Sequence, residues 1–288
     1  MSVCWTILSN LMQQEASKKS NQWTRKGRDK LAKKQGTKRI KTKRRVKWLN
    51  VALLLVTFIM LGIACFAGFK LVTGLLSYKA GDDVYETIYT EAGNTSLGEG
   101  ETEIDFEKLK AINPEFVGWL KLDGTVINYP VAQHTDNEYY LEHLFNGDVN
   151  HMGCVYFDFR NASDLSDRNT MIYAHHTNNG SMFYRLEEYK NQSFYETHPH
   201  FVFTAEHGTY LFEPFAGKVM DGNVPFVQIV FDSDQEFLDY MQEFIDGSTF
   251  QSPIKVTAED KIVTMSTCTD DFSNARYVLL SKVTKIKS

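Results

Sequence analysis

Cysteine is scarce in this sequence of 288 residues, which contains only four. Cys4 and Cys65 lie before or within the one long apolar run, so Cys154 and Cys268 are the only thiols in the rest of the chain. Two cysteines are too few for a disulfide-stabilised scaffold of the secreted type. A single bridge between Cys154 and Cys268 stays open on the sequence, although we expect Cys154 to be a free, non-catalytic thiol.

Several other signatures are missing as well. The sequence shows no cluster of residues with metal-ligand spacing, no glycine-rich phosphate loop and no cofactor fingerprint. It also shows no repeat period. We therefore predict an activity that needs neither a metal nor a cofactor, because none of the motifs that would hold one is present.

Charge is divided unevenly along the chain. Residues 1–47 contain 15 Lys and Arg against two acidic residues, a net charge of +13, and the remainder contains 16 basic and 34 acidic residues, a net charge of −18. A basic segment is sometimes a nucleic-acid site. This one contains no recognisable binding module and directly precedes an apolar run, so we predict a role in membrane topology and no nucleic-acid partner.

The apolar run is WLNVALLLVTFIMLGIACFAGF, residues 48–69. Its 22 residues carry no charge, and as a helix they would span roughly 33 Å, enough for the core of a bilayer. A cleaved signal peptide has a shorter apolar region nearer the N-terminus. We therefore predict a basic cytoplasmic segment (1–47) and a retained transmembrane signal-anchor helix (48–70). Because positive charge marks the cytoplasmic side, we expect an extracellular C-terminal domain in a single-pass protein of the cell membrane.

The rest of the chain divides into a predicted stalk or linker (71–103), which is acidic and rich in small residues, and a catalytic domain (104–288). Alternating apolar and aromatic residues predict strands, and an Asp123-Gly124 turn predicts a hairpin. The expected strands beyond that hairpin are 153–159, 169–175, 200–206, 209–220, 261–268 and 275–283. The expected helices are 106–112, 136–145, 181–189 and 232–245. Short strands with few crossover helices favour a mainly β fold, a closed or nearly closed β-barrel with peripheral helices.

Cys268 is the candidate nucleophile. It ends the apolar segment IVTMSTC, and Arg276 begins the next one, so two adjacent strands would bring both residues to the same end of the sheet. An arginine beside a thiol favours the thiolate and offers fixed donors to a developing oxyanion. Of the eight histidines, His175 and His176 end the segment TMIYAH and precede a polar loop, where sites are often assembled.

The chain resembles class B sortases, which are membrane-anchored cysteine transpeptidases of Gram-positive bacteria. The stretches that carry the resemblance are NPEFVGWLKLDGTVINYPVAQHTDNEYYLEHLF, DFRN, NTMIYAHHTNNGSMFYRLEEY and KIVTMSTCTDDFSNARYVL. The resemblance implies a sortase-like closed barrel of about eight strands, with the catalytic residues His175, Cys268 and Arg276. It also implies that the helix at 232–245 is the class B insertion. Ala174 departs from the family pattern, which usually has glycine before the histidine.

The resemblance further implies the reaction. Cys268 would attack the threonine carbonyl of a C-terminal sorting signal resembling Asn-Pro-x-Thr-Asn, and an amine of a lipid-linked peptidoglycan precursor would resolve the thioacyl enzyme. His175 would act as acid and base, and Arg276 would stabilise the oxyanion. The implied partners are surface proteins that carry the signal, the precursor and the cytoplasmic membrane. Ser266, Thr267 and Asp270, which flank the nucleophile, are candidate substrate-binding residues.

Three alternatives remain on the sequence. A pilin-polymerising sortase would use the same chemistry with another amine. An L,D-transpeptidase would carry His-Gly-Cys at its nucleophile, whereas Ser266 and Thr267 precede the cysteine here. A non-enzymatic surface β-domain, an adhesin or receptor ectodomain, would make Cys268 a buried core residue.

Overall fold

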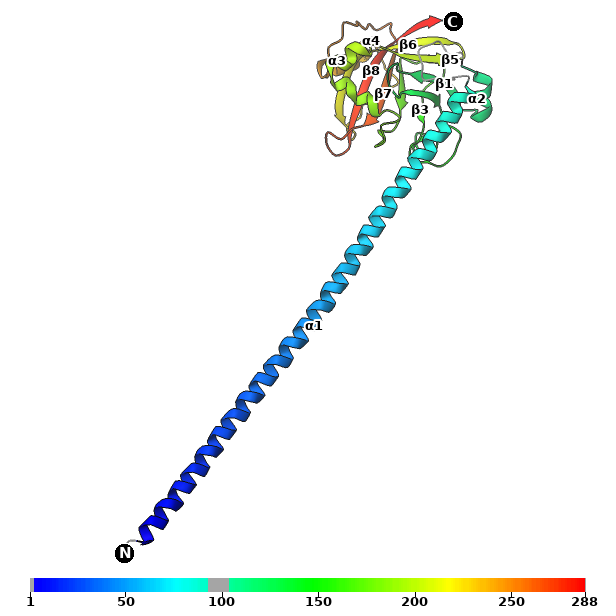
Figure 1. The fold of residues 1–288 in the computed structure, drawn as a ribbon. Coiled ribbons are helices and arrows are strands. Elements are labelled where there is room, and N and C mark those ends of the chain that lie inside the picture. Colours follow the sequence, from blue (N-terminus) through cyan, green and yellow to red (C-terminus); the bar gives the residue numbers. More distant parts are fainter. Residues whose placement is uncertain (1–2, 93–103, 288) are drawn as a thin grey trace. The chain divides into compact units, whose positions relative to one another are not determined.

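The computed structural model describes residues 3–92 and 104–287. The chain divides into two compact units, Met1–Val72 and Thr73–Ser288. A long helix, α1 (Val3–Glu91), begins in the first unit and ends in the second (Figure 1).

The first unit consists of the N-terminal part of α1. The large apolar side chains of residues 48–72 are exposed, from Trp48 at 68% to Val72 at 54%. The helical stretch Lys47–Glu91 contains a segment long and apolar enough to cross a membrane, judged by length and composition. Exposed apolar side chains over more than 18 residues are the pattern of a helix whose solvent is lipid. This agrees with the single membrane-spanning helix predicted from the sequence.

The second unit begins earlier than the sequence pattern indicates. Residues 73–91 continue α1, and Tyr85, Ile88 and Ala92 are at most 2% exposed, packed against the β domain. Their spacing places all three on one face of the helix. This part of the expected linker (71–103) is therefore an ordered helix of the domain, and the part at 93–103 lies outside the described residues.

The β strands of the second unit close into a barrel with the order β1-β2-β3-β4-β7-β8-β6-β5. This confirms the prediction of a mainly β, closed barrel of about eight strands with peripheral helices. Most neighbours are antiparallel, but β2 with β3 and β4 with β7 are parallel. The strands are β1 (Phe116–Lys121), β2 (Asn128–Ala132), β3 (Val155–Phe157), β4 (Asn169–Tyr173), β5 (Phe201–Ala205), β6 (Gly208–Asp221), β7 (Ile262–Cys268) and β8 (Ala275–Lys287).

Short helices surround the barrel. They are α2 (Phe106–Ile112), η1 (Tyr139–Leu141), η2 (Tyr184–Lys190), α3 (Gln192–Thr197) and α4 (Asp234–Asp246). The helix expected at 136–145 is reduced to the three 3₁₀ residues of η1. The side chain of Asp136 accepts hydrogen bonds from the backbone N–H groups of Glu138 and Tyr139, which forms a turn that competes with a regular helix.

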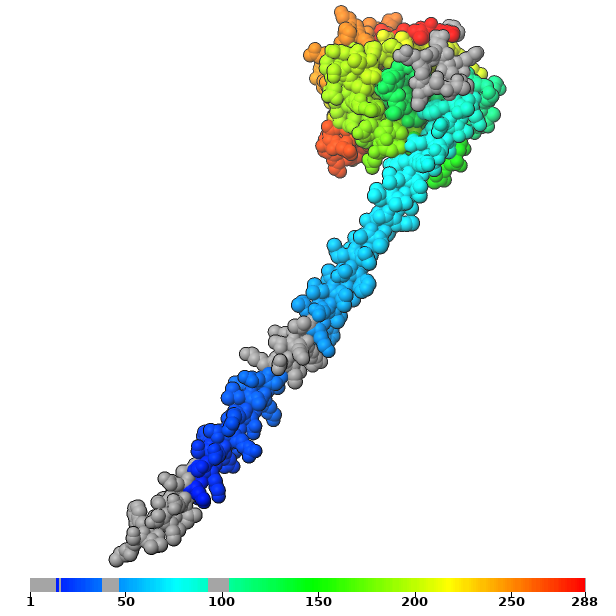
Figure 2. Space-filling view, viewed as in Figure 1, coloured from blue at the N-terminus to red at the C-terminus, as the bar shows by residue number. Residues whose placement is uncertain are grey.

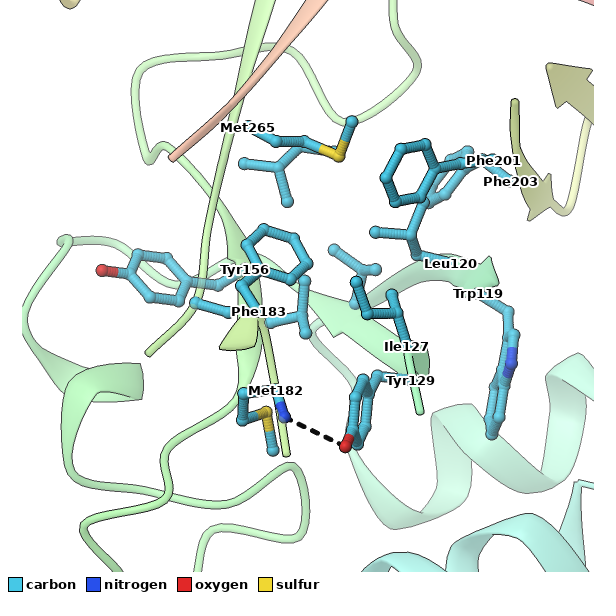
Figure 3. Packing of buried hydrophobic residues seen from close by; sticks show 14 of the residues in the cluster. Trp119, Leu120, Ile127, Tyr129, Tyr156, Met182, Phe183, Phe201, Phe203 and Met265 are labelled. Carbon is cyan, nitrogen blue, oxygen red and sulfur yellow. Dashed lines mark hydrogen bonds between the residues drawn. The ribbon is translucent and has the colours of Figure 1, made fainter. Parts of the chain in front are cut away.

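The core has two parts, separated by the sheet. Inside the barrel, Leu120, Ile127, Phe201, Phe203 and Met265 pack together, and the hydroxyl of Tyr129 accepts a hydrogen bond from the Met182 N–H (Figure 3). Outside it, residues of β6, β7 and β8 pack beneath α4, and on β7 the outward-facing Ile262 alternates with the inward-facing Val263 and Met265. Members of this outer cluster include Ile262, Val278, Leu280, Phe237 and Met241. Successive residues of a strand point to opposite faces, so β7 and β8 are covered on both sides along most of their length.

Candidate active site

Cys268 lies at the end of β7, directly opposite Arg276 near the start of β8. Opposed residues of an antiparallel pair project from the same face of the sheet. That face is the outer one, because Ile262, which has the same parity as Cys268 along β7, packs in the cluster beneath α4. Cys268 is exposed, as is the turn 270–274 that follows it. Part of this C-terminal region of the chain, coloured orange, lies on the surface of the domain in the space-filling view (Figure 2). The prediction that adjacent strands bring Cys268 and Arg276 to the same end of the sheet is confirmed by this register.

The segment that carries His175 reaches the same end of the sheet. β4 runs parallel to β7 with Tyr173 opposite Ser266, so both strands end at this edge. Beyond the strand, the Ala174 N–H lies 3.5 Å from the Ser266 carbonyl, and the Thr267 hydroxyl donates to the Ala174 carbonyl at 3.0 Å. These contacts fasten the histidine segment to the two residues that precede the nucleophile.

The ring of His175 is held by a backbone carbonyl. Its Nε2 lies 2.7 Å from the carbonyl oxygen of Leu141. A carbonyl only accepts, so Nε2 carries a hydrogen and Nδ1 is the nitrogen available for proton exchange. Gly153, which has a φ of +67°, allows this approach: a Cβ there would lie 2.6 Å from the Tyr140 carbonyl and 3.0 Å from Cδ2 of His175. Sequence reasoning missed both Leu141 and Gly153, because neither carries reactive chemistry.

His176 has a different environment. Its side chain is only 7% exposed, and its Nε2 lies 2.9 Å from Oε1 of Glu187. The ring also packs against that of Tyr184, with 4.7 Å between the centroids. A buried imidazole that is engaged with a carboxylate is poorly placed to exchange protons with a substrate. Geometry therefore favours His175, the half-buried ring, over its neighbour.

The guanidinium of Arg276 has few partners. Its Nη1 donates to the carbonyl of Ala275 at 3.1 Å, and within residues 104–287 it forms no ion pair with a carboxylate. The side chain is half-buried. Its other N–H groups are thus left for a ligand on the outer face beside the thiol.

The three accessory candidates differ in position. Ser266 shares the outer face with Cys268 and is 3% exposed, and Asp270 is exposed in the turn. Thr267 lies on the opposite face, and its hydroxyl is occupied by the Ala174 carbonyl. Thr267 therefore supports the histidine segment from the inner face, away from the thiol, and is not placed to contact a substrate there.

Cys154 is buried and unpaired, at 1% exposure. Its Sγ donates to the Val155 carbonyl, 3.3 Å away. Burial raises the pKa of this thiol to about 12, so the thiolate is scarce at neutral pH. The expectation of a free thiol is confirmed, and the bridge to Cys268 is absent.

The sortase domain family matches residues 120–284, more than half of the chain. The chain belongs to the sortase family. This sortase is 32% identical over 233 residues to Sortase B of Listeria monocytogenes, a match that covers 79% of this chain and 95% of the relative. It is also 32% identical over 237 residues to Sortase B of Staphylococcus aureus, with 81% and 97% covered.

Solved structures agree with the sequence relatives. A Staphylococcus aureus sortase B–substrate complex matches this sortase with a TM-score of 0.60 and 36% identity, over 63% of this chain and 85% of that chain. The protein is thus a class B sortase, a cysteine transpeptidase. Membership of the sortase family replaces two alternatives left open by the sequence, a non-enzymatic surface domain and an L,D-transpeptidase.

Proposed function

We propose that this sortase cleaves a C-terminal sorting signal resembling Asn-Pro-x-Thr-Asn after its threonine and transfers the protein to an amine of a lipid-linked peptidoglycan precursor. The thiolate of Cys268 attacks the threonine carbonyl carbon, a C–S bond forms, and the C–N bond to the next residue breaks. The accepting amine then attacks the thioester, so a new C–N bond forms as the C–S bond breaks.

The observation that carries this proposal is the register of β7 and β8, which sets Cys268 opposite Arg276 on the outer face. Attack on a carbonyl places negative charge on its oxygen. Donors fixed beside the thiol stabilise that oxyanion more than they stabilise the neutral carbonyl. Arg276, without a carboxylate partner in the described part of the domain, supplies such donors together with the backbone N–H groups near the cysteine.

His175 supplies the proton transfers. In acylation, the amine that leaves must gain a proton, and in the second half of the reaction the attacking amine must lose one. Nε2 is fixed on the Leu141 carbonyl, so Nδ1 is the nitrogen that would exchange the proton in both steps. The same ring thus serves as acid and then as base.

The N-terminal unit suits this chemistry. The exposed apolar helix is a possible membrane anchor, and the basic segment before it favours a cytoplasmic N-terminus and an extracellular catalytic domain. Both proposed substrates, a surface protein awaiting release and a lipid-linked precursor, are held at the membrane. Anchoring the enzyme there keeps it in the plane where both substrates lie.

The test is cleavage of a peptide library by the full-length protein in detergent micelles, read by mass spectrometry. We expect a covalent adduct on Cys268 that contains the residues up to threonine, and release of the downstream peptide. Adding candidate amines then identifies the acceptor: transfer only to a lysine side chain of another surface protein would favour pilin polymerisation over wall anchoring. Absence of any adduct across the library would contradict the proposed substrate class.

A further inference from the structure

The carboxylate of Glu187, on η2, connects two segments of the site. Its Oε1 lies 2.9 Å from Nε2 of His176, the residue after His175. Its Oε2 accepts a hydrogen bond of 2.7 Å from the hydroxyl of Thr269, the residue after Cys268. One side chain therefore links the segment of the proposed acid–base group to the segment of the proposed nucleophile.

Lys190, one turn further along η2, adds a cation. Its Nζ donates to Glu187 at 2.9 Å and to the Thr269 hydroxyl at 2.8 Å, and it forms an ion pair with Asp271. The Thr269 hydroxyl has one proton, so it donates to one carboxylate at a time, either that of Glu187 or that of Asp271 at 2.6 Å. We call His176, Glu187, Lys190, Thr269 and Asp271 the Glu187 network.

The Glu187 network is partly shielded from water. The side chains of Glu187 and Lys190 are 24% and 25% exposed, and that of His176 is 7% exposed. Burial by itself would raise the pKa of Glu187, but hydrogen bonds from Thr269, Lys190 and His176 outweigh it, and the pKa is lowered. Burial would likewise lower the pKa of Lys190, but Asp271 and Glu187 raise it. The Glu187 carboxylate and the Lys190 ammonium are thus charged at neutral pH. They are held by specific hydrogen bonds, unlike a solvent-exposed ion pair with no fixed geometry.

The turn after Cys268 is held by few side chains; its backbone is held by the Gly222 N–H, which donates to the Asn274 carbonyl at 2.9 Å, and by the Ala275 N–H, which donates to the Phe272 carbonyl at 3.1 Å. Residues 270–274 are exposed, and among these only Asp271 has a side-chain bond within the described chain. Thr269 is 5% exposed, and its backbone N–H donates to the Ala275 carbonyl at 3.1 Å. The backbone of this turn continues directly from Cys268, so its position sets the position of the thiol and matters to the reaction. A misplacement of about 1 Å at a reacting centre can cost about 10²-fold in rate.

We propose that Glu187 and Lys190 are positioning residues for transpeptidation: they hold Thr269, and with it the backbone of Cys268, in register with His175. Neither touches the reacting atoms, and both act through the turn. The proposal rests on the proposed function, because it concerns the same thiol and the same acylation step. In η2, Leu186 and Tyr189 are buried in the core, while Glu187 and Lys190 reach the segment that follows the nucleophile.

The test uses the full-length protein in micelles and one sorting peptide. Lys190→Met removes the cation and keeps most of the side-chain length, and Thr269→Val removes the shared hydroxyl at nearly constant shape. For each we expect kcat for acylation to fall by about 10- to 100-fold, with KM nearly unchanged. Cys268 should still react with a small alkylating reagent, and Lys190→Arg should recover most of the lost kcat because it restores a cation with several donors.

Lys110→Met is the matched control, since it removes a lysine that pairs with Glu206 on the domain surface; its kcat should equal that of wild type. The proposal is overturned if Lys190→Met keeps wild-type kcat, or if activity falls only in proportion to the folded fraction and Lys190→Arg restores nothing. If Lys190→Met does not fold, Thr269→Val decides by the same criterion. A wild-type protein that forms no thioacyl adduct overturns the proposed function and this inference with it, whereas an active wild type beside an equally active Lys190→Met overturns this inference alone.

Discussion

Replacing Arg276 with lysine separates charge from geometry at the proposed site. The substitution keeps a positive charge opposite Cys268 but loses the planar set of donors. In the structure Arg276 donates one hydrogen bond to the Ala275 carbonyl and has no carboxylate partner among the described residues. Its guanidinium therefore contributes little to the stability of the fold. A change in activity would therefore report on the bound substrate rather than on stability.

If Arg276 donates to the developing oxyanion, lysine should lower kcat by about 10²- to 10³-fold, the cost of one oxyanion donor, or about 2.7–4 kcal/mol of transition-state stabilisation. If it served only as a positive charge beside the thiol, lysine would restore nearly full activity. Arg276→Gln, which keeps an amide donor without charge, completes the set: under the donor hypothesis it should not be worse than lysine.

Single-turnover acylation on a fluorogenic sorting peptide, with the adduct counted by mass spectrometry, measures the relevant step directly. Arg185→Lys, at an arginine that pairs with Glu188 on η2, is the control and should match wild type. Turnover of Arg276→Lys within about threefold of wild type would refute the donor hypothesis, since that loss is well below the cost of an oxyanion donor.

Other expectations follow from single features. His175→Ala should lose about 10²- to 10⁴-fold in rate, and an active His175→Ala beside an inactive His176→Ala, measured on the same peptide, would move the acid–base role by one residue. Cys154→Ala should keep most activity; a dead but folded variant would contradict a structural role for this buried thiol. Exchanging residues 221–258 for those of a sortase with another signal should shift peptide preference, and an unchanged preference at full activity would place specificity elsewhere. Protease added to intact protoplasts should remove the C-terminal domain; its protection would reverse the proposed topology.

Much of the fold was visible in the sequence because local patterns specify it. Alternation across the Asp123-Gly124 turn predicts the β1–β2 hairpin, and the paired apolar segments ending at Cys268 and beginning at Arg276 predict two neighbouring strands. Both are short-range features, in which a strand's period and a tight turn determine the pairing. The apolar run at 48–69 is equally local, because length and composition alone distinguish a membrane-spanning helix.

The sequence motif assigns the catalytic role to His175 by resemblance, but residue type and periodicity do not distinguish it from His176. The two residues are adjacent and identical, and only tertiary contacts, the Leu141 carbonyl for one and Glu187 for the other, give them different environments. The contact between His175 and Leu141 joins positions 34 residues apart, and no sequence pattern in either segment predicts it.

Long-range contacts also explain two further features that the sequence did not predict: the packing of the end of α1 on the domain and the contact between Glu187 and Thr269. Tyr85 and Ile88 lie in a stretch that precedes an acidic, small-residue segment, and their burial depends on a surface that the distant β domain supplies. Glu187 meets Thr269 across 82 positions. By itself the sequence determined the strands, the membrane-spanning helix and the identity of the reactive groups, because these depend on periodicity and side-chain chemistry. Only closure of the barrel decided which groups of distant segments face one another, such as His175 and Leu141 or Glu187 and Thr269, because that depends on long-range packing.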